Sequence, residues 1–162
     1  MFSDRILILA KALIDEARSK KLTIATAESC TGGLIAAALT EIPGASDVVE
    51  CGFVVYSNKS KAKLLGVKLT TIVHHGAVSE EVARAMAEGA LKHSTAQMAV
   101  SCTGVAGPSG GTRDKPVGLV HIAAARVNET TLSEECRFGD LGRSEIRLRS
   151  VETALKLLLQ LV

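Results

Sequence analysis

The chain has 162 residues, a length typical of one compact domain, and 47% of them are hydrophobic while 22% are charged. This composition excludes a disordered or fibrous chain. A formal net charge of +2, with one Tyr, three Phe and no Trp, provides neither a basic tract nor the aromatic platforms of single-stranded nucleic-acid binders, so we expect no nucleic-acid partner.

Nothing in the sequence predicts export or membrane association. No stretch approaches about 18 consecutive apolar residues, and Asp4 and Arg5 precede a helical pattern instead of the apolar core of a signal peptide. The four cysteines are widely spaced and form no CxxC pair, which argues against a zinc ribbon or a thioredoxin-like site. We therefore expect a soluble cytoplasmic protein with reduced thiols.

The first third of the chain predicts a helix followed by a strand, a turn and a second helix. Apolar residues recur at three- and four-residue steps over residues 4–20, a helical pattern. Residues 22–27 form a β-branched run typical of a strand. A turn over residues 28–33 leads into the apolar helix LIAAALTEI, which ends before Pro43.

The middle of the chain predicts two further strands separated by a helix. Residues 48–57 resemble a strand buried on both faces over much of its length, and a polar, Lys-rich segment follows it. Ser79 is suited to N-cap a helix that runs to about His93, because two glutamates occupy its first turn. A third strand is expected over residues 97–102.

The last third begins with a glycine-rich loop, residues 103–112. Strands over 118–127 and 131–138 follow, joined by a turn at Asn128–Glu129, and a helix over 142–161 closes the chain. Alternating strands and helices followed by a hairpin predict an α/β fold in one domain. We expect a three-layer α/β/α sandwich with a mixed, mostly parallel sheet and an antiparallel strand near one edge.

Ser29 is the candidate nucleophile. It follows the first predicted strand and precedes a helix, and ligands of such sheets bind beyond the carboxyl ends of the strands. N–H groups of Thr31, Gly32 or Gly33 could stabilise the oxyanion of an acyl-transfer intermediate. The same residue types also form plain helix caps and turns, so local chemistry leaves a purely structural role open.

A serine nucleophile needs a base, but His74 and His75 are expected in a turn, and no histidine falls in the loops that follow the three strands. Lys61 lies just past the second strand, and a desolvated lysine can accept a serine proton. Tyr56, the single tyrosine, could relay that proton between Ser29 and Lys61. The alternative interpretation is a solvated, lysine-rich helix face.

The glycine-rich loop is the candidate anion site. Its N–H groups could form a concave nest for phosphate or carboxylate, although neither a P-loop nor a dinucleotide fingerprint is present. Arg143 could add a bidentate clamp on a phosphate. A plain surface loop and a solvated arginine are the competing interpretations.

Two other kinds of chemistry have little support in the sequence. Cys30 adjoins Ser29, and neighbouring side chains point in different directions, so we expect Cys30 to pack in the core as a small hydrophobe. The His74–His75 pair lacks a second ligand pair at helical spacing. We therefore expect neither a metal nor another cofactor.

Four segments, in order and spanning most of the chain, resemble the CinA C-terminal family, the nicotinamide-nucleotide amidases. They are TAESCTGG (26–33), VVYSNKSKAKLLGV (54–67), HGAVSEEVARAMAEGA (75–90) and CTGVAGPSGGTRDKPVGLV (102–120). The resemblance implies an anticodon-binding-domain-like sandwich that hydrolyses the carboxamide of nicotinamide mononucleotide, yielding nicotinate mononucleotide and ammonia in pyridine-nucleotide recycling.

The resemblance also implies roles for individual residues. Ser29 would attack the amide carbon, while Lys61 with Tyr56 would accept and return the proton. The substrate-binding residues implied are Thr31, Gly32, Gly33, Thr103, Gly104, Gly107, Gly111 and Arg143. Because some family members carry an additional N-terminal domain and this sequence starts at Met1 before its first helix, the stand-alone form is expected.

The partners expected are a small-molecule nucleotide substrate and further copies of the chain in a homo-oligomer, without nucleic acid or membrane. A different class of function also fits the same residues. The chain could be a non-catalytic, nucleotide-binding regulatory module that keeps the pocket and performs no chemistry.

Overall fold

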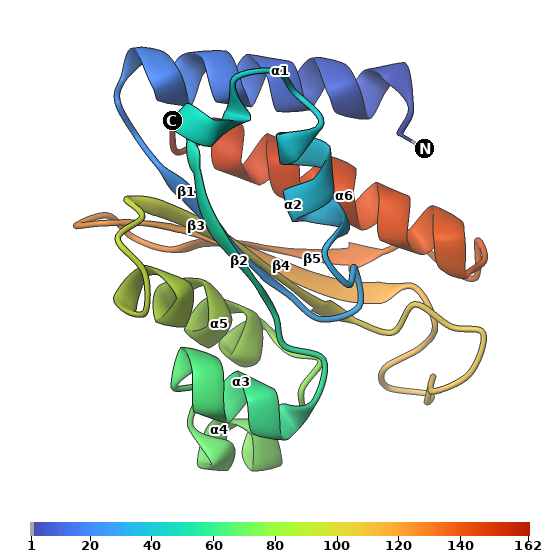
Figure 1. The fold of residues 1–162 in the computed structure, drawn as a ribbon. Helices are drawn as coiled ribbons and strands as arrows, with labels where there is room; N and C mark the ends of the chain where they lie inside the picture. The colour runs from blue at the N-terminus through green and yellow to red at the C-terminus, as the bar shows by residue number, and fades with distance from the viewer. Residues whose placement is uncertain (1) are drawn as a thin grey trace.

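A computed structural model describes residues 2–162, which form a five-stranded sheet between two layers of helices (Figure 1). The predicted three-layer α/β/α sandwich is confirmed. The strands are β1 (Ile24–Glu28), β2 (Val49–Val54), β3 (Met98–Gly104), β4 (Leu119–Arg126) and β5 (Leu132–Arg137).

The sheet is mixed, with the strand order β2-β1-β3-β4-β5. β1 pairs in parallel with both β2 and the central strand β3, whereas β4 pairs antiparallel with both β3 and β5. Four strands therefore run in one direction, and β4, next to the edge, runs against them. This confirms the expected mostly parallel sheet with an antiparallel strand near one edge.

Helices cover both faces of the sheet (Figure 1). One layer holds α1 (Asp4–Ser19), α2 (Leu34–Thr40) and α6 (Arg143–Leu159), and the other holds α3 (Asn58–Leu65), α4 (Leu69–His75) and α5 (Glu80–Lys92). A short 3₁₀ helix, Ala45–Asp47, precedes β2. No helix within residues 2–162 is both long and apolar enough to cross a membrane.

Small side chains on the α5 side of the sheet allow a close approach of helix and strands. Alanines on β4 and α5 form a buried cluster, with Ala83 and Ala87 of α5 against Ala123 and Ala125 of β4. The opposite face carries larger aliphatic residues, which pack under α1, α2 and α6.

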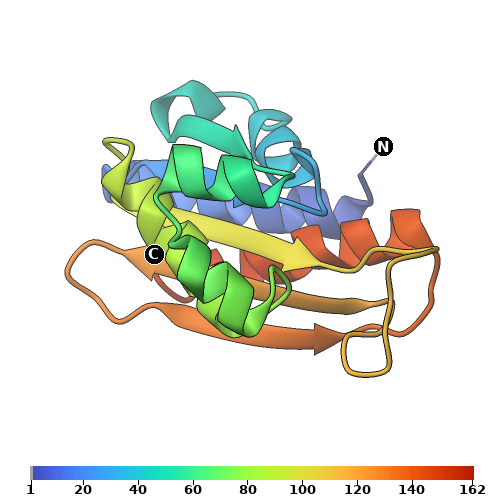
Figure 2. The ribbon, with the colours of Figure 1, turned by 90° about the horizontal axis from the view of Figure 1, so that it is seen from below.

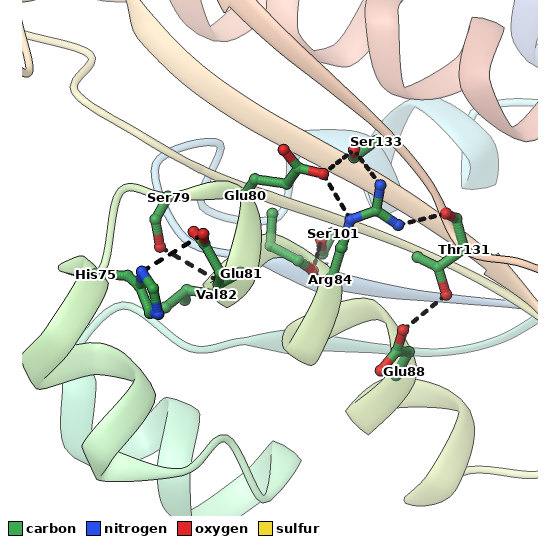
Figure 3. Close-up of polar contacts among 11 residues, drawn as sticks. His75, Ser79, Glu80, Glu81, Val82, Arg84, Glu88, Ser101, Thr131 and Ser133 are labelled. Atoms are coloured by element: carbon green, nitrogen blue, oxygen red, sulfur yellow. Dashed lines mark hydrogen bonds and ion pairs between the residues drawn. The ribbon is translucent and has the colours of Figure 1, made fainter.

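Polar contacts fix α5 to the edge of the sheet (Figure 3). Ser79 caps the helix by accepting the N–H of Val82 at 3.3 Å, as predicted. Arg84 donates to Ser133 Oγ of β5 at 2.7 Å, and that hydroxyl donates to Glu80 at 2.9 Å. These bonds join the first turns of α5 to the hairpin strand.

Two predictions about the second strand region were wrong in detail. β2 is an edge strand in which half-buried and exposed residues alternate, because only β1 pairs with it. His74 and His75, expected in a turn, belong to α4. The Lys-rich segment forms α3, which approaches α5 closely because Gly89 has no side chain to collide with the backbone of Leu65.

The parallel strands bring distant segments to one end of the sheet. β1, β2 and β3 end at Glu28, Val54 and Gly104, so the segments that follow emerge together. Figure 2 shows the long loop after β3 beside the start of α6 at this end. The topology of the sheet alone therefore brings the candidate residues to the same end of the sheet.

Candidate active site

Ser29 lies in the turn between β1 and α2 and is 9% exposed. Its backbone N–H donates to the carbonyl of Cys102 at 2.9 Å, which ties the start of the turn to β3. The hydroxyl is therefore held at the carboxyl end of the central strands by main-chain bonding and is not left on a mobile loop.

Lys61 reaches Ser29 from α3. Its side chain is 1% exposed, and Nζ lies 2.9 Å from Ser29 Oγ, 2.9 Å from the carbonyl of Val55 and 3.3 Å from that of Tyr56. Ser57 caps α3 by accepting the N–H of Ser60 at 3.1 Å and so fixes the turn that carries the lysine. The interpretation of Lys61 as part of a solvated helix face is wrong.

Burial lowers the pKa of the Lys61 ammonium below its usual value of 10.5. Opposing this shift, the nearby Cys30 thiol favours the charged amine. No carboxylate of residues 2–162 lies within ion-pair distance of Nζ. The neutral amine, which is the form a general base requires, is therefore favoured by burial.

Tyr56 and Arg143 form a second polar group beside this pair. Arg143 donates from Nη2 to Tyr56 Oη and from Nη1 to the carbonyl of Gly107, both at 2.9 Å. Tyr56 is 59% exposed, and across the described residues its phenol makes no hydrogen bond to Ser29 or Lys61. Only its carbonyl meets Lys61, so the proton relay stays a prediction.

Glu28 is a buried carboxylate that the sequence reasoning missed. It is fully buried and accepts the N–H groups of Gly33 at 3.0 Å and of Ile35 and Ala36 at 2.9 Å. It thereby satisfies the free donors at the start of α2. An acidic residue placed between a strand and a glycine-initiated helix was the available signal.

The backbone donors expected to hold an oxyanion are partly occupied. The N–H of Gly33 is bound by Glu28, and that of Gly32 donates to the carbonyl of Ser29 at 3.0 Å. Thr31 is fully buried. Among residues 2–162 the N–H groups of Cys30 and Thr31 have no backbone acceptor, so these two amides next to Ser29 are the candidate oxyanion donors.

Cys30 packs in the core, with Sγ 3.5 Å from Sγ of Cys102. The hydrogen bond between the two sulfurs lowers the pKa of the Cys30 thiol, and the positive charges of Lys61 and Arg147 add to this effect. The same contact, together with burial, raises the pKa of Cys102. Cys30 therefore behaves mainly as a buried partner of Cys102.

Arg147, also missed, binds the turn from α6. Its Nε donates to the carbonyl of Cys30 at 3.1 Å and its Nη2 to that of Thr31 at 2.9 Å. Because the arginine lies more than a hundred residues further along the chain, only the tertiary fold reveals the contact.

A cavity of about 280 Å³ lies beside these groups. It is lined by Cys30, Tyr56, Val78, Arg143 and the loop residues Gly104, Val105, Ala106, Gly107, Ser109 and Gly110. Of the residues expected at the site, Tyr56, Gly104, Gly107 and Arg143 line this cavity, whereas Ser29 and Lys61 are not among its lining residues.

Several loop residues have clear structural reasons for their identity. A Cβ at Gly104 would lie 2.7 Å from the side chain of Val120, and one at Gly111 would lie 2.8 Å from the backbone nitrogen of Val117. Thr103 is buried and donates from Oγ1 to the carbonyl of Ala77 at 2.8 Å. Their contacts with a substrate remain predictions.

No group of three or more His, Cys, Asp or Glu side chains in residues 2–162 is arranged to hold a metal ion. His121 is nearly buried on β4, where burial lowers its pKa and the carboxylates of Glu135 and Glu80 oppose that shift. It does not line the cavity beside Tyr56 and Arg143, so it supplies no base there.

Comparison with known proteins places these features in a family. The CinA C-terminal domain matches residues 7–162. A CinA-like protein of Endomicrobium trichonymphae is 54% identical over 139 residues, covering 85% of this chain and 32% of that protein. A putative competence-damage inducible protein of Caldicellulosiruptor bescii is 49% identical over 152 residues, covering 93% of this chain and 36% of that protein.

Solved structures agree with these sequence matches. The competence/damage inducible protein CihA of Agrobacterium tumefaciens has a TM-score of 0.98 and 52% identity, covering 99% of this chain and 98% of that one. A CinA superfamily protein of Escherichia coli has a TM-score of 0.91 and 32% identity, covering 100% and 94%. The chain spans about a third of the length of the curated relatives it matches. It belongs to the CinA C-terminal domain family.

Proposed function

We propose that this chain is a serine amidohydrolase that converts nicotinamide mononucleotide to nicotinate mononucleotide and ammonia. The observation that carries this is a buried lysine amine 2.9 Å from a serine hydroxyl, without a carboxylate partner among the described residues. The reaction class follows from the nucleophile and base, and the choice of substrate rests on the family resemblance.

The contacts of Lys61 suit a general base. A neutral amine has two hydrogens and one lone pair, and the carbonyls of Val55 and Tyr56 can accept the two hydrogens. The lone pair would then be free to take the proton of Ser29 Oγ, which lies 2.9 Å from Nζ. This pattern orients the base without an acidic residue, whose negative charge would favour the protonated, inactive form.

In the acylation step, Lys61 takes the proton of Ser29 Oγ while the oxygen attacks the carboxamide carbon. The carbonyl oxygen becomes an oxyanion, which the N–H of Cys30 would stabilise, since it has no backbone acceptor among residues 2–162. Collapse of the intermediate breaks the C–N bond, and the Lys61 ammonium protonates the departing nitrogen. Ammonia leaves, and the nicotinoyl group remains as an ester on Ser29.

Deacylation reverses the roles with water as the nucleophile. Lys61 accepts a proton from water, the hydroxide attacks the ester, and the bond to Ser29 Oγ breaks. The proton on Lys61 returns to Oγ, and nicotinate mononucleotide leaves. One amine therefore serves both half-reactions, as a base at entry and an acid at exit.

Arg143 and the glycine-rich loop supply the anion contacts in this proposal. The guanidinium lines the cavity and already bonds two neutral oxygens, those of Tyr56 and Gly107. A phosphate would make stronger, charge-assisted bonds to the same group. Thr103, Gly104, Gly107 and Gly111 would shape the rest of the ribose-phosphate site.

The test is an ammonia-release assay on nicotinamide mononucleotide with the parent chain, Ser29→Ala and Ser46→Ala. We expect the parent to release ammonia, Ser29→Ala to lose about 10³-fold or more in kcat, and Ser46→Ala, an exposed control, to match the parent. Because the base is an amine, a chelator should leave the rate unchanged. Thermal stabilisation by the mononucleotide without turnover would instead support a binding module.

A further inference from the structure

The turn after Ser29 has three successive carbonyls, each held by a specific donor. The carbonyl of Ser29 accepts the N–H of Gly32 at 3.0 Å. The next two, of Cys30 and Thr31, accept Nε and Nη2 of Arg147 at 3.1 and 2.9 Å. A single guanidinium from a helix remote in sequence therefore binds two adjacent peptide groups beside the proposed nucleophile.

Because peptide groups are planar, these hydrogen bonds fix the orientation of the N–H of Cys30. In a planar trans peptide the N–H points opposite to the preceding carbonyl. The bond from Gly32 fixes the peptide plane before the Cα of Cys30, and the bond from Arg147 Nε fixes the plane after it. The N–H of Cys30 lies in the first of these planes, which the bond from Gly32 fixes. The N–H of Gly32 is in turn held in place because Arg147 Nη2 binds the carbonyl of Thr31 in the same peptide.

The guanidinium of Arg147 packs closely against Gly32 in this turn. A Cβ at Gly32 would lie 3.2 Å from Arg147 Nη2, and Gly32 has a φ of +61°, a region that favours glycine. The absent side chain leaves the space for the arginine. The turn and the arginine are thus adapted to each other.

We propose that Arg147 is a positioning residue, which holds the Ser29–Gly32 turn so that the N–H of Cys30 points to the substrate carboxamide oxygen. It touches neither substrate nor reacting atoms and acts through the backbone it binds. The inference rests on the proposed function, because it assigns the oxyanion donor of that reaction. Loss of the guanidinium would free two carbonyls and allow the 31–32 peptide to rotate. The N–H of Gly32 would then leave the carbonyl of Ser29, and the peptide that carries the N–H of Cys30 would lose its fixed orientation.

The experiment compares Arg147→Gln and Arg147→Lys with Arg149→Gln. Arg149 lies two residues further along α6, where it is exposed and pairs with Glu145 at 2.7 Å, so it is a matched control for charge on the helix. With nicotinamide mononucleotide we expect kcat to fall about 100-fold in Arg147→Gln while KM stays within about threefold of the parent. Arg147→Lys, which cannot bind both carbonyls in a fixed fork, should be intermediate, and Arg149→Gln should match the parent.

A purely structural role would give a different pattern. Lower stability without misplacement of the donor would reduce the fraction of active protein but leave pre-steady-state rates per folded site unchanged. Active sites are therefore counted by titration, and melting temperatures are recorded for every variant. If Arg147→Gln melts below the assay temperature, Arg147→Lys decides: a parental kcat per active site in that variant would overturn the proposal.

A second substrate separates this proposal from the identity of the amide. p-Nitrophenyl acetate would acylate Ser29 through the same oxyanion, and mass spectrometry locates the acetyl group. If the parent is acylated at Ser29 but releases no ammonia from the mononucleotide, the proposed function fails while Arg147 remains testable, with slower acylation expected in Arg147→Gln. Acylation at the parental rate in that variant would overturn the role of Arg147, and a parent inert in both assays would overturn both proposals.

Discussion

Lys61 Nζ and Ser29 Oγ lie 2.9 Å apart although 32 positions separate the two residues in sequence. The contact arises because β1 and β2 are parallel neighbours, so that the turn after one strand and the helix after the next leave the sheet at the same end. Lys61 is the only cation within hydrogen-bond distance of this hydroxyl among the described residues. Activity should therefore depend on this one amine.

We expect Lys61→Ala to lower kcat for ammonia release by about 10³-fold, because it removes the general base, with a smaller change in KM. Lys63→Ala is the matched control, since Lys63 lies on the same helix and is exposed. Steady-state kinetics on both variants test this. Equal rates for the Lys61→Ala variant and the parent would remove the lysine from the base role.

The pH dependence follows from the lowered pKa of Lys61. Burial disfavours the ammonium, so the neutral base forms at a pH below 10.5, the usual lysine value. At pH values below the pKa of Lys61 the amine is protonated, and kcat/KM should rise about tenfold per pH unit until that pKa is reached. A profile measured from pH 6 to 10 checks this, and an activity that falls steadily with rising pH would contradict it.

The sequence predicted the order of the strands and of α1, α2, α5 and α6, but not α4, and it predicted the end of the sheet at which the candidate residues gather. Both follow from local signals: periodic apolar residues, the Ser79 cap, and strand–turn–helix units whose parallel strands must end together. The contact between Ser29 and Lys61 follows from that topology. Local sequence signals that identify the strands and helices therefore indicate which segments meet at one end of the sheet, even before any side-chain contact is known.

The features that sequence reasoning missed depend on tertiary contacts. Glu28 is the exception, because the N–H groups it binds lie only five to eight positions further along the chain and an acidic residue before a helix is a local signal. Arg147 meets the Ser29 turn only because α6 packs beside α2. The phenol of Tyr56 turns to Arg143, a partner 87 positions away. Such contacts have no local periodicity, so a single sequence gives no signal for them.

The position of the Tyr56 phenol predicts an effect on binding more than on chemistry. Its hydrogen bond orients Arg143, the proposed phosphate ligand. We expect Tyr56→Phe to raise KM for nicotinamide mononucleotide about fivefold, the value of one modest hydrogen bond, with kcat within about threefold of the parent. Nicotinamide riboside, which lacks the phosphate, is the control substrate, and its KM should not change.

A proton relay through the phenol would reverse that pattern. In that case Tyr56→Phe would lower kcat by a factor of about 100 or more for both substrates, because the relay acts on the carboxamide and not on the phosphate. The two alternatives are therefore distinguished by the kinetic constant that changes. Binding through Arg143 changes KM for the mononucleotide alone, whereas a relay lowers kcat for both substrates.

Glu28 should contribute to stability through its bonds to α2. In Glu28→Gln an NH₂ group replaces one carboxylate oxygen and faces backbone donors, so at least one buried N–H loses its acceptor and the negative charge at the helix start is lost. We expect a loss of about 2 kcal/mol in the free energy of unfolding, measured by urea denaturation. Glu41→Gln, at the exposed carboxyl end of the same helix, should change stability by less than about 0.5 kcal/mol.

The same variant also tests whether the carboxylate holds the Ser29 turn. Gly33, one of its donors, directly follows Gly32, whose N–H fixes the carbonyl of Ser29. Loosening of this segment should lower kcat by about tenfold in protein that is still folded, because the nucleophile and the Cys30 amide would both lose their fixed positions. An unchanged kcat together with the expected loss of stability would show that Glu28 supports α2 alone, and that the bonds from Arg147 and Cys102 suffice to hold the turn.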